Sequence, residues 1–164
     1  MADPKKRRST KTSLETGETH QSFASTSVSD PAKVRAFAID AARLLADNKC
    51  EDVVLLDVTG LSQLSDYIVL ASGTSDRQMR SSGDDLGEVG AKHGWSAFRS
   101  HADDRSTWII VDFVDVVAHI FEPNTRAHYD LEMLWADAPR VEWEREVKGG
   151  TGGGSKGRNR AGLE

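Results

Sequence analysis

Cysteine and long hydrophobic runs are nearly absent from this 164-residue chain. The single cysteine, Cys50, excludes an internal disulfide and falls short of the ligand set that zinc requires. No apolar run approaches the roughly 18 residues that would span a bilayer. The five histidines show no paired ligand spacing, so the sequence predicts no metal site and no cofactor. These absences predict a cytoplasmic protein in a reducing compartment, with no membrane association.

Charge is distributed unevenly along the chain. Residues 1–29 hold the basic cluster 5–8 (KKRR) among eleven Ser and Thr, and residues 148–164 hold seven glycines with a net charge of +3. Neither end has a periodic apolar pattern, so both are predicted to be disordered tails around one folded domain, residues 30–147. That domain carries a net charge of -10. It would repel phosphate and be steered toward a basic protein surface, whereas the basic tails are candidates for contact with RNA.

Apolar periodicity predicts three helices. The first is capped by Asp30, with Pro31 at the first helical position, and ends near Asp47. The second covers about 76–92 after a cap at Thr74 or Ser75. Its three interior glycines, at about 1 kcal/mol each, make it the least secure element unless a close-packed neighbour needs the missing side chains. The third follows Pro123, is capped by Asn124, ends before Pro139, and aligns four apolar residues on one stripe: Ala127, Leu131, Leu134 and Trp135.

Five apolar runs are predicted as strands: 53–58, 67–71, 95–99, 107–113 and 116–121. The first is so apolar that it is predicted to be a central strand. In the last two, alternation places Trp108, Ile110 and Asp112 on one face, and both faces are mostly apolar. The element order predicts an α/β fold, a single-domain sandwich with a mixed five-stranded sheet and helices on its faces.

Two kinds of function are compatible with these residues. A nucleotidyltransferase-like enzyme would use Thr74 and Ser75 with Asp112 and Asp115 to hold magnesium. However, two carboxylates on one strand face need an i, i+2 spacing, and these two are three residues apart across a turn. The alternative is a protein-binding module, in which the aromatic residues near acidic side chains form either core or a binding patch: Trp108, Tyr129 and Trp135.

Four ordered segments resemble the ribosomal silencing factor (Iojap-related) family: 57–58 (DV) with 65–75 (SDYIVLASGTS), 108–113 (WIIVDF), 115–121 (DVVAHIF) and 129–135 (YDLEMLW). The resemblance covers about residues 30–140. It implies a nucleotidyltransferase-like fold that lacks the catalytic carboxylate pair, and no enzymatic activity. It further implies a repressor of translation that binds ribosomal protein fourteen of the large ribosomal subunit and sterically prevents the small subunit from joining.

Carried over by position, the resemblance implies a partner-binding surface anchored by Trp108, with the remaining contacts from five residues: Asp112, Asp115, His119, Tyr129 and Glu132. Two departures border this surface. Val114 stands where the family usually has Gly in the tight turn, so the turn must be built differently or be strained. His101 and Ala102 stand where the family tends to have Glu and Gly.

Three further expectations concern assembly, RNA and self-association. The chain could instead be a large-subunit assembly factor, which would be found on immature particles. The basic tails are candidates for contact with ribosomal RNA. An apolar sheet face would favour a homodimer when the protein is free.

Overall fold

The computed structural model describes residues 29–97, 99–102 and 105–146, so most of each predicted tail lies outside the described residues. The described part is the predicted α/β sandwich built on a mixed five-stranded sheet. Its elements, in chain order, are α1 (Pro31–Asp47), β1 (Glu51–Asp57), β2 (Tyr67–Ser72), α2 (Asp76–Lys92), β3 (Arg99–Ala102), β4 (Trp108–Asp112), β5 (Val116–Phe121), α3 (Pro123–Tyr129) and α4 (Leu131–Leu134).

The sheet order is β1-β2-β5-β4-β3, with β2 and β5 parallel and every other pair antiparallel. The prediction that the first strand is central is therefore wrong, because β1 lies at an edge. The outer edge of β1 is covered by the segment around Pro139 and Val141. The N–H of Asp57 donates to the carbonyl of Pro139 at 2.9 Å, and the N–H of Val141 donates to that of Leu55 at 2.8 Å. This cover explains how an edge strand can be so apolar.

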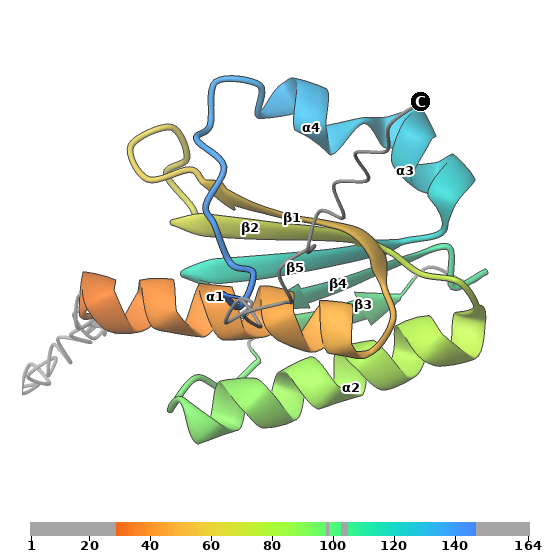
Figure 1. Ribbon diagram of the computed structural model, residues 1–164, viewed down its shortest axis with the longest axis horizontal. Helices are drawn as coiled ribbons and strands as arrows, with labels where there is room; N and C mark the ends of the chain where they lie inside the picture. The colour runs from red at the N-terminus through yellow and green to blue at the C-terminus, as the bar shows by residue number, and fades with distance from the viewer. Residues whose placement is uncertain (1–28, 98, 103–104, 147–164) are drawn as a thin grey trace, which may run out of the picture.

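Helices cover both faces of the sheet, as predicted. The long helices α1 and α2 lie together on one face, and α3 and α4 lie on the other (Figure 1). Side chains from β4 and β5 divide between the faces as their alternation predicts. Ile109, Val111 and Ala118 are buried under the long helices, whereas Phe121 packs on the opposite side with Trp108.

The first two helices begin where the capping signals place them. Asp30 accepts from the N–H of Ala32 at 3.0 Å, and Ser75 accepts from the N–H of Gln78 at 3.2 Å. The glycines of α2 differ in their surroundings. A Cβ on Gly90 would lie 2.4 Å from Cε1 of Phe113, whereas one on Gly87 would meet nothing within 4 Å. A close-packed neighbour therefore explains Gly90 and not Gly87.

The predicted third helix breaks in two. Asp130 adopts a left-handed conformation (φ 43°) that ends α3, and the same residue caps α4 by accepting from the N–H of Met133. The cap of α3 is Glu122, which accepts from the N–H of Thr125, rather than the predicted Asn124. The third predicted strand is also displaced, from 95–99 to β3, because pairing with β4 starts only at Arg99.

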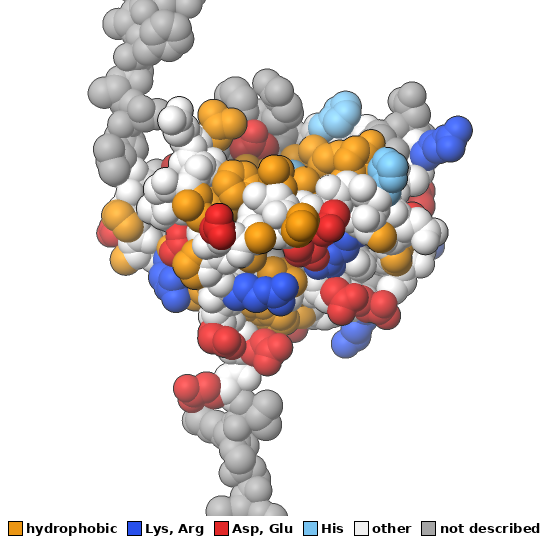
Figure 2. All heavy atoms as spheres, turned by 90° about the horizontal axis from the view of Figure 1, so that it is seen from above, with side chains coloured by type: hydrophobic (Ala, Val, Ile, Leu, Met, Phe, Trp, Pro, Cys, Tyr) orange, Lys and Arg blue, Asp and Glu red, His pale blue; other side chains and the backbone are white. Residues whose placement is uncertain are grey.

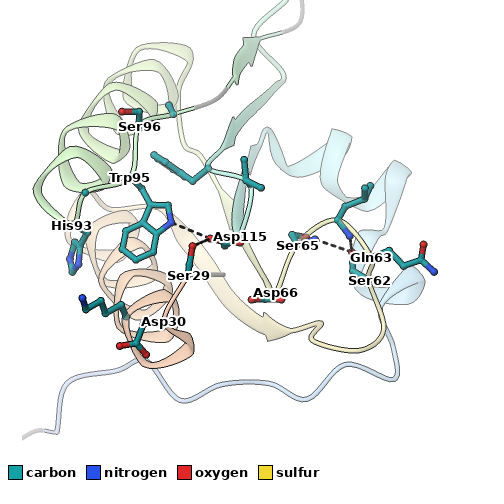
Figure 3. Close-up of a pocket in the computed structure, with 16 residues that line it drawn as sticks. Ser29, Asp30, Ser62, Gln63, Ser65, Asp66, His93, Trp95, Ser96 and Asp115 are labelled. Atoms are coloured by element: carbon teal, nitrogen blue, oxygen red, sulfur yellow. Dashed lines mark hydrogen bonds between the residues drawn. The ribbon is translucent and has the colours of Figure 1, made fainter. Parts of the chain in front are cut away.

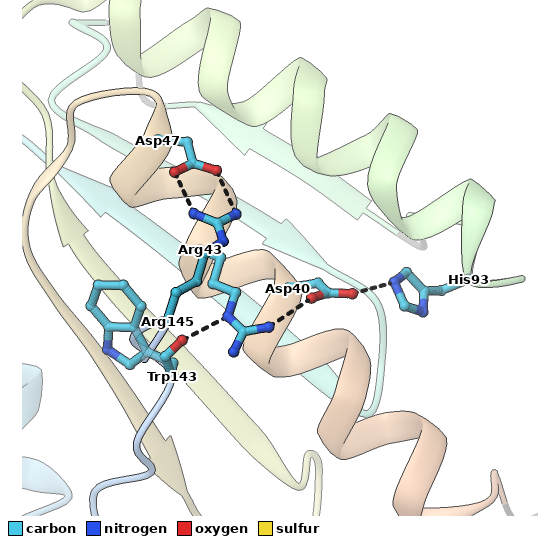
Figure 4. A network of polar contacts seen from close by, with 6 residues as sticks. All are labelled: Asp40, Arg43, Asp47, His93, Trp143 and Arg145. Carbon is cyan, nitrogen blue, oxygen red and sulfur yellow. Dashed lines mark hydrogen bonds and ion pairs between the residues drawn. The ribbon is translucent and has the colours of Figure 1, made fainter. Parts of the chain in front are cut away.

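The segment after Pro139 is held against α1 by polar contacts (Figure 4). The guanidinium of Arg145 makes two 2.8 Å hydrogen bonds to the carboxylate of Asp47, which lower the pKa of that carboxyl. Nε of Arg43 donates to the carbonyl of Trp143 at 2.8 Å. These contacts fix the segment that also covers β1.

A candidate partner-binding surface

Four rings gather on the sheet face that carries α3. Trp108 begins β4, and His119 and Phe121 lie on the adjacent β5, with Trp108 opposite Phe121 in the antiparallel register. The ring centroid of Trp108 is 5.0 Å from that of Phe121, 5.8 Å from that of His119 and 4.8 Å from that of Tyr129 on α3. Three of the predicted partner-binding residues, Trp108, His119 and Tyr129, are therefore in one cluster.

Apolar side chains on the two short helices extend this surface. Tyr129 is 53% exposed, Met133 73% and Leu134 69%. We call Trp108, His119, Tyr129, Met133 and Leu134 the aromatic patch. Seen from the α3–α4 side, hydrophobic side chains form a band across the molecule, with histidines near one end of it (Figure 2).

Leu134 corrects the sequence prediction, which placed it on the buried stripe of a continuous helix. Leu131 and Trp135 pack on the core, whereas Leu134 is exposed. Ala127, the first residue of the predicted stripe, is exposed as well, because the break at Asp130 puts α3 and α4 in different helical phases. Sequence reasoning missed Met133 as well. Met133 lies off the predicted apolar stripe, and that position is the signal that could have found it. Asp130 is a signal for the break, since Asp is among the few non-glycine residues that tolerate the left-handed region.

His119 is neutral in the folded protein. Burial lowers its pKa to about 4, although the negative charge of Asp112 acts in the opposite direction. Its Nδ1 accepts a hydrogen bond from the indole Nε1 of Trp108 at 3.2 Å, which requires an unprotonated ring nitrogen. His119 therefore fixes the orientation of Trp108.

Asp112 ends β4 near this patch. Its Oδ1 accepts from the N–H of Val114 at 2.8 Å. Val114 has a φ of 74°, a conformation that β-branched residues resist. The expectation of an unusual or strained turn at Val114 is thus confirmed.

Asp115 lies apart from the patch, in a groove on the helix side of the turn (Figure 3). Its carboxylate accepts from Oγ of Ser29 at 2.6 Å and from the indole Nε1 of Trp95 at 3.3 Å. The turn at Val114 separates Asp112 and Asp115, so these two carboxylates do not act together.

Glu132 is engaged with a buried cation. Its Oε1 accepts from Nε and Nη2 of Arg126 at 2.9 and 2.6 Å. Nη1 of Arg126 donates to the carbonyl of Asp52 and to Oγ of Ser72. Glu132 therefore helps to hold α3 and α4 on β1 and β2, beneath the exposed part of the patch.

The geometry does not support the enzyme hypothesis. Tyr67 is paired with Val116 and Ser72 with Phe121 in the parallel β2–β5 ladder. Thr74 follows the carboxyl end of β2, whereas Asp115 precedes the amino end of β5. Five residue steps of a strand separate these ends by roughly 16 Å, too far for one magnesium site.

The described part of the chain contains neither a cluster of potential metal ligands nor a candidate membrane span. Within residues 29–97, 99–102 and 105–146, no group of three or more His, Cys, Asp or Glu side chains could hold a metal ion. No described helix is long and apolar enough to cross a membrane. Cys50 is buried, and burial raises the pKa of its thiol.

Comparisons with a family model and with individual known proteins point to the same family. Residues 31–161 match the family model described as "Ribosomal silencing factor during starvation". The chain is 36% identical over 104 residues to a ribosomal silencing factor of Halalkalibacterium halodurans, covering 63% of this chain and 89% of the relative. It is 34% identical over 102 residues to that of Bacillus subtilis, covering 62% and 86%.

Solved structures share the fold. A crystal structure from Bacillus halodurans has a TM-score of 0.55 at 32% identity, covering 68% of this chain and 98% of the other. One from Chromobacterium violaceum has a TM-score of 0.58 at 27% identity, covering 73% and 97%. The chain therefore belongs to the ribosomal silencing factor family.

Proposed function

We propose that this protein represses translation by binding ribosomal protein fourteen of the large subunit through the aromatic patch, and that its bulk then blocks the small subunit sterically. Family membership supports the ribosomal target. The acidic folded domain suits a basic ribosomal protein, because complementary charge raises the association rate and excludes wrong partners. We place this action in the cytoplasm.

The observation that carries the proposal is the half-buried ring of Trp108 beside exposed apolar side chains. Trp and Tyr are among the residues most enriched at the hot spots of protein interfaces. In the proposed complex Trp108 is the anchor, and Tyr129 adds contact area beside it. His119 acts through Trp108, so it is a positioning residue.

The other residues of the predicted surface have separate roles. Asp112 supplies negative charge at the margin of the patch. Glu132 acts indirectly, because its pair with Arg126 positions α4. Asp115 contributes from the separate groove on the helix side of the turn.

Sedimentation with isolated ribosomal subunits tests the proposal. The wild-type chain should travel with the large subunit and reduce the formation of joined ribosomes. Trp108→Ala should weaken large-subunit binding about thirty-fold, as expected for a loss of roughly 2 kcal/mol. Trp143→Ala is the matched control, because Trp143 packs against the core on the other side of the sheet.

A second candidate is a role in large-subunit assembly. One observation favours it: the chain is 31% identical over 96 residues to mouse "Mitochondrial assembly of ribosomal large subunit protein 1", covering 56% of this chain and 42% of that relative. An assembly factor would accompany immature particles and be absent from finished large subunits. A silencing factor would bind finished ones.

Two further expectations concern the free protein and its ends. A homodimer would cover the aromatic patch when no ribosome is present. Contact of the basic ends with ribosomal RNA would steepen the salt dependence of subunit binding. Subunit binding is measured over a series of salt concentrations for the full chain and for a variant with residues 5–8 neutralised. The salt dependence should be less steep in the variant.

A further inference from the structure

A groove of about 1110 Å³ opens where β2 and β5 begin (Figure 3). Its walls come from the start of α1, the loop before β2, the residues after α2 and the β4–β5 turn. It is distinct from the aromatic patch. Of the residues in the predicted partner surface, Asp115 alone lines it.

Two aspartates, Asp66 and Asp115, are neighbours in this groove. The main-chain carbonyl of Asp115 accepts from the N–H groups of Asp66 and Tyr67 at 2.8 and 3.0 Å, which fixes both aspartates at one place. Burial, and then the negative charges of Asp115 and Asp57, raise the pKa of Asp66. The carboxylate of Asp66 has no hydrogen bond or ion pair within the described residues.

The remaining charges leave the groove acidic. Asp30 lines it too, although its carboxylate caps α1. The basic residues that line it are Lys33 and His93, and Nε2 of His93 lies 2.9 Å from the carboxylate of Asp40. A positive side chain entering the groove would therefore meet more negative than positive charge.

The groove also has apolar walls. Leu64 is 86% exposed and Val114 46%, both at its margin. The indole of Trp95 forms another wall, backed by Phe37 at a centroid distance of 5.3 Å and fixed by its hydrogen bond to Asp115. Long basic side chains bury their methylene stems on such surfaces while their charged heads reach carboxylates.

We propose that this groove binds an arginine side chain from an extended basic segment of the protein partner, as a second contact beside the aromatic patch. A planar guanidinium binds a carboxylate through two parallel hydrogen bonds and packs well on aromatic rings, in both respects better than an ammonium. Charge complementarity selects the occupant, because the proposed partner is a basic ribosomal protein. The identity of the partner rests on the proposed function.

A titration on the full chain tests the groove without the ribosome. A tetra-arginine peptide is added to ¹⁵N-labelled protein, and the indole N–H signals of Trp95 and Trp108 are followed by NMR. The Trp95 signal should shift saturably while that of Trp108 stays in place. Asp66→Asn should weaken the apparent affinity at least three-fold. Asp84→Asn, an equal charge change on the exposed side of α2, should leave it unchanged. An unmoved Trp95 signal, or equal effects of the two variants, would overturn the proposal.

Two more arms of the experiment identify the occupant and its source. If peptide binding appears only after Lys5, Lys6, Arg7 and Arg8 are all changed to Gln, the chain's own basic segment is the occupant, and the proposed occupant is wrong.

With isolated large subunits, Asp66→Asn should weaken binding three- to ten-fold and Asp84→Asn should not. Equal subunit binding by both variants would overturn the groove as a partner contact. If the wild-type chain does not bind the subunit at all, the proposed function and its partner fail, and the peptide result still reports on the groove.

Discussion

The indole N–H of Trp108 donates to Nδ1 of His119 at 3.2 Å across adjacent strands. This hydrogen bond links the proposed anchor of the partner surface to the protonation state of a histidine. Protonating His119 at Nδ1 would remove the acceptor and place a charge in a desolvated site.

His119 should make the protein less stable in acid. Its pKa is about 4 in the folded state against 6.5 in the unfolded state, so the unfolded state binds more protons between these values. The free energy of unfolding should therefore fall as pH drops from 6.5 to 4, by about 1–3 kcal/mol from this residue. Urea unfolding at several pH values measures the fall.

His119→Gln should remove most of that pH dependence, because glutamine does not titrate and its amide oxygen is able to accept from Trp108. An NMR titration of the wild-type imidazole should give a midpoint near 4. A midpoint near 6.5 would contradict the burial of a neutral His119.

Two glycines of α2 should respond oppositely to alanine. Gly90→Ala should lower the free energy of unfolding by about 1–3 kcal/mol, since its Cβ would overlap Phe113. Gly87→Ala should raise it by about 0.5–1 kcal/mol through helix propensity, because nothing lies within 4 Å. Thermal or urea unfolding of the pair checks the prediction, and a shift in the same direction for both would count against the packing of α2.

Val114→Gly should stabilise the protein. The substitution relieves a positive φ of 74° in a β-branched residue, and glycine adopts that conformation freely. We expect a gain of about 1 kcal/mol in the free energy of unfolding. A loss of stability would mean that the exposed side chain of Val114 makes contacts worth more than the strain.

Breaking the buried ion pair should cost stability before it affects binding. Arg126→Ala leaves Glu132 half-buried without its partner and removes the hydrogen bonds to Asp52 and Ser72. We expect a loss of about 3 kcal/mol in urea unfolding. Tyr129→Ala, at an exposed site, should cost under about 1 kcal/mol yet weaken subunit binding. Equal stability losses in the two variants would contradict the separation of roles.

Local signals made the starts of α1 and α2 and the strand faces predictable. Asp30 and Ser75 cap their helices through contacts within three residues, and the alternation of β4 and β5 follows from strand geometry alone. The edge position of β1 could not be predicted in this way. An apolar run predicts a central strand, but the edge of β1 is covered by the chain near Pro139, which is far from β1 in the sequence.

The candidate surface was predictable only in part, for a related reason. Trp108, His119 and Tyr129 converge because the β4–β5 pairing and α3 bring them together. Asp115 does not join them, since one residue with positive φ, Val114, redirects the chain after Asp112. A β-branched residue by itself gives no signal for that conformation, and only the family's usual Gly at this position indicated an unusual turn.

The most direct test of the proposed function is co-sedimentation of the full chain with isolated large subunits, comparing the wild type with Trp108→Ala and Trp143→Ala. We expect that the wild type and Trp143→Ala bind and suppress subunit joining, whereas Trp108→Ala binds about thirty-fold more weakly. Equal binding by all three, with joining unaffected, would contradict both the repression of joining and the role of Trp108 as its anchor.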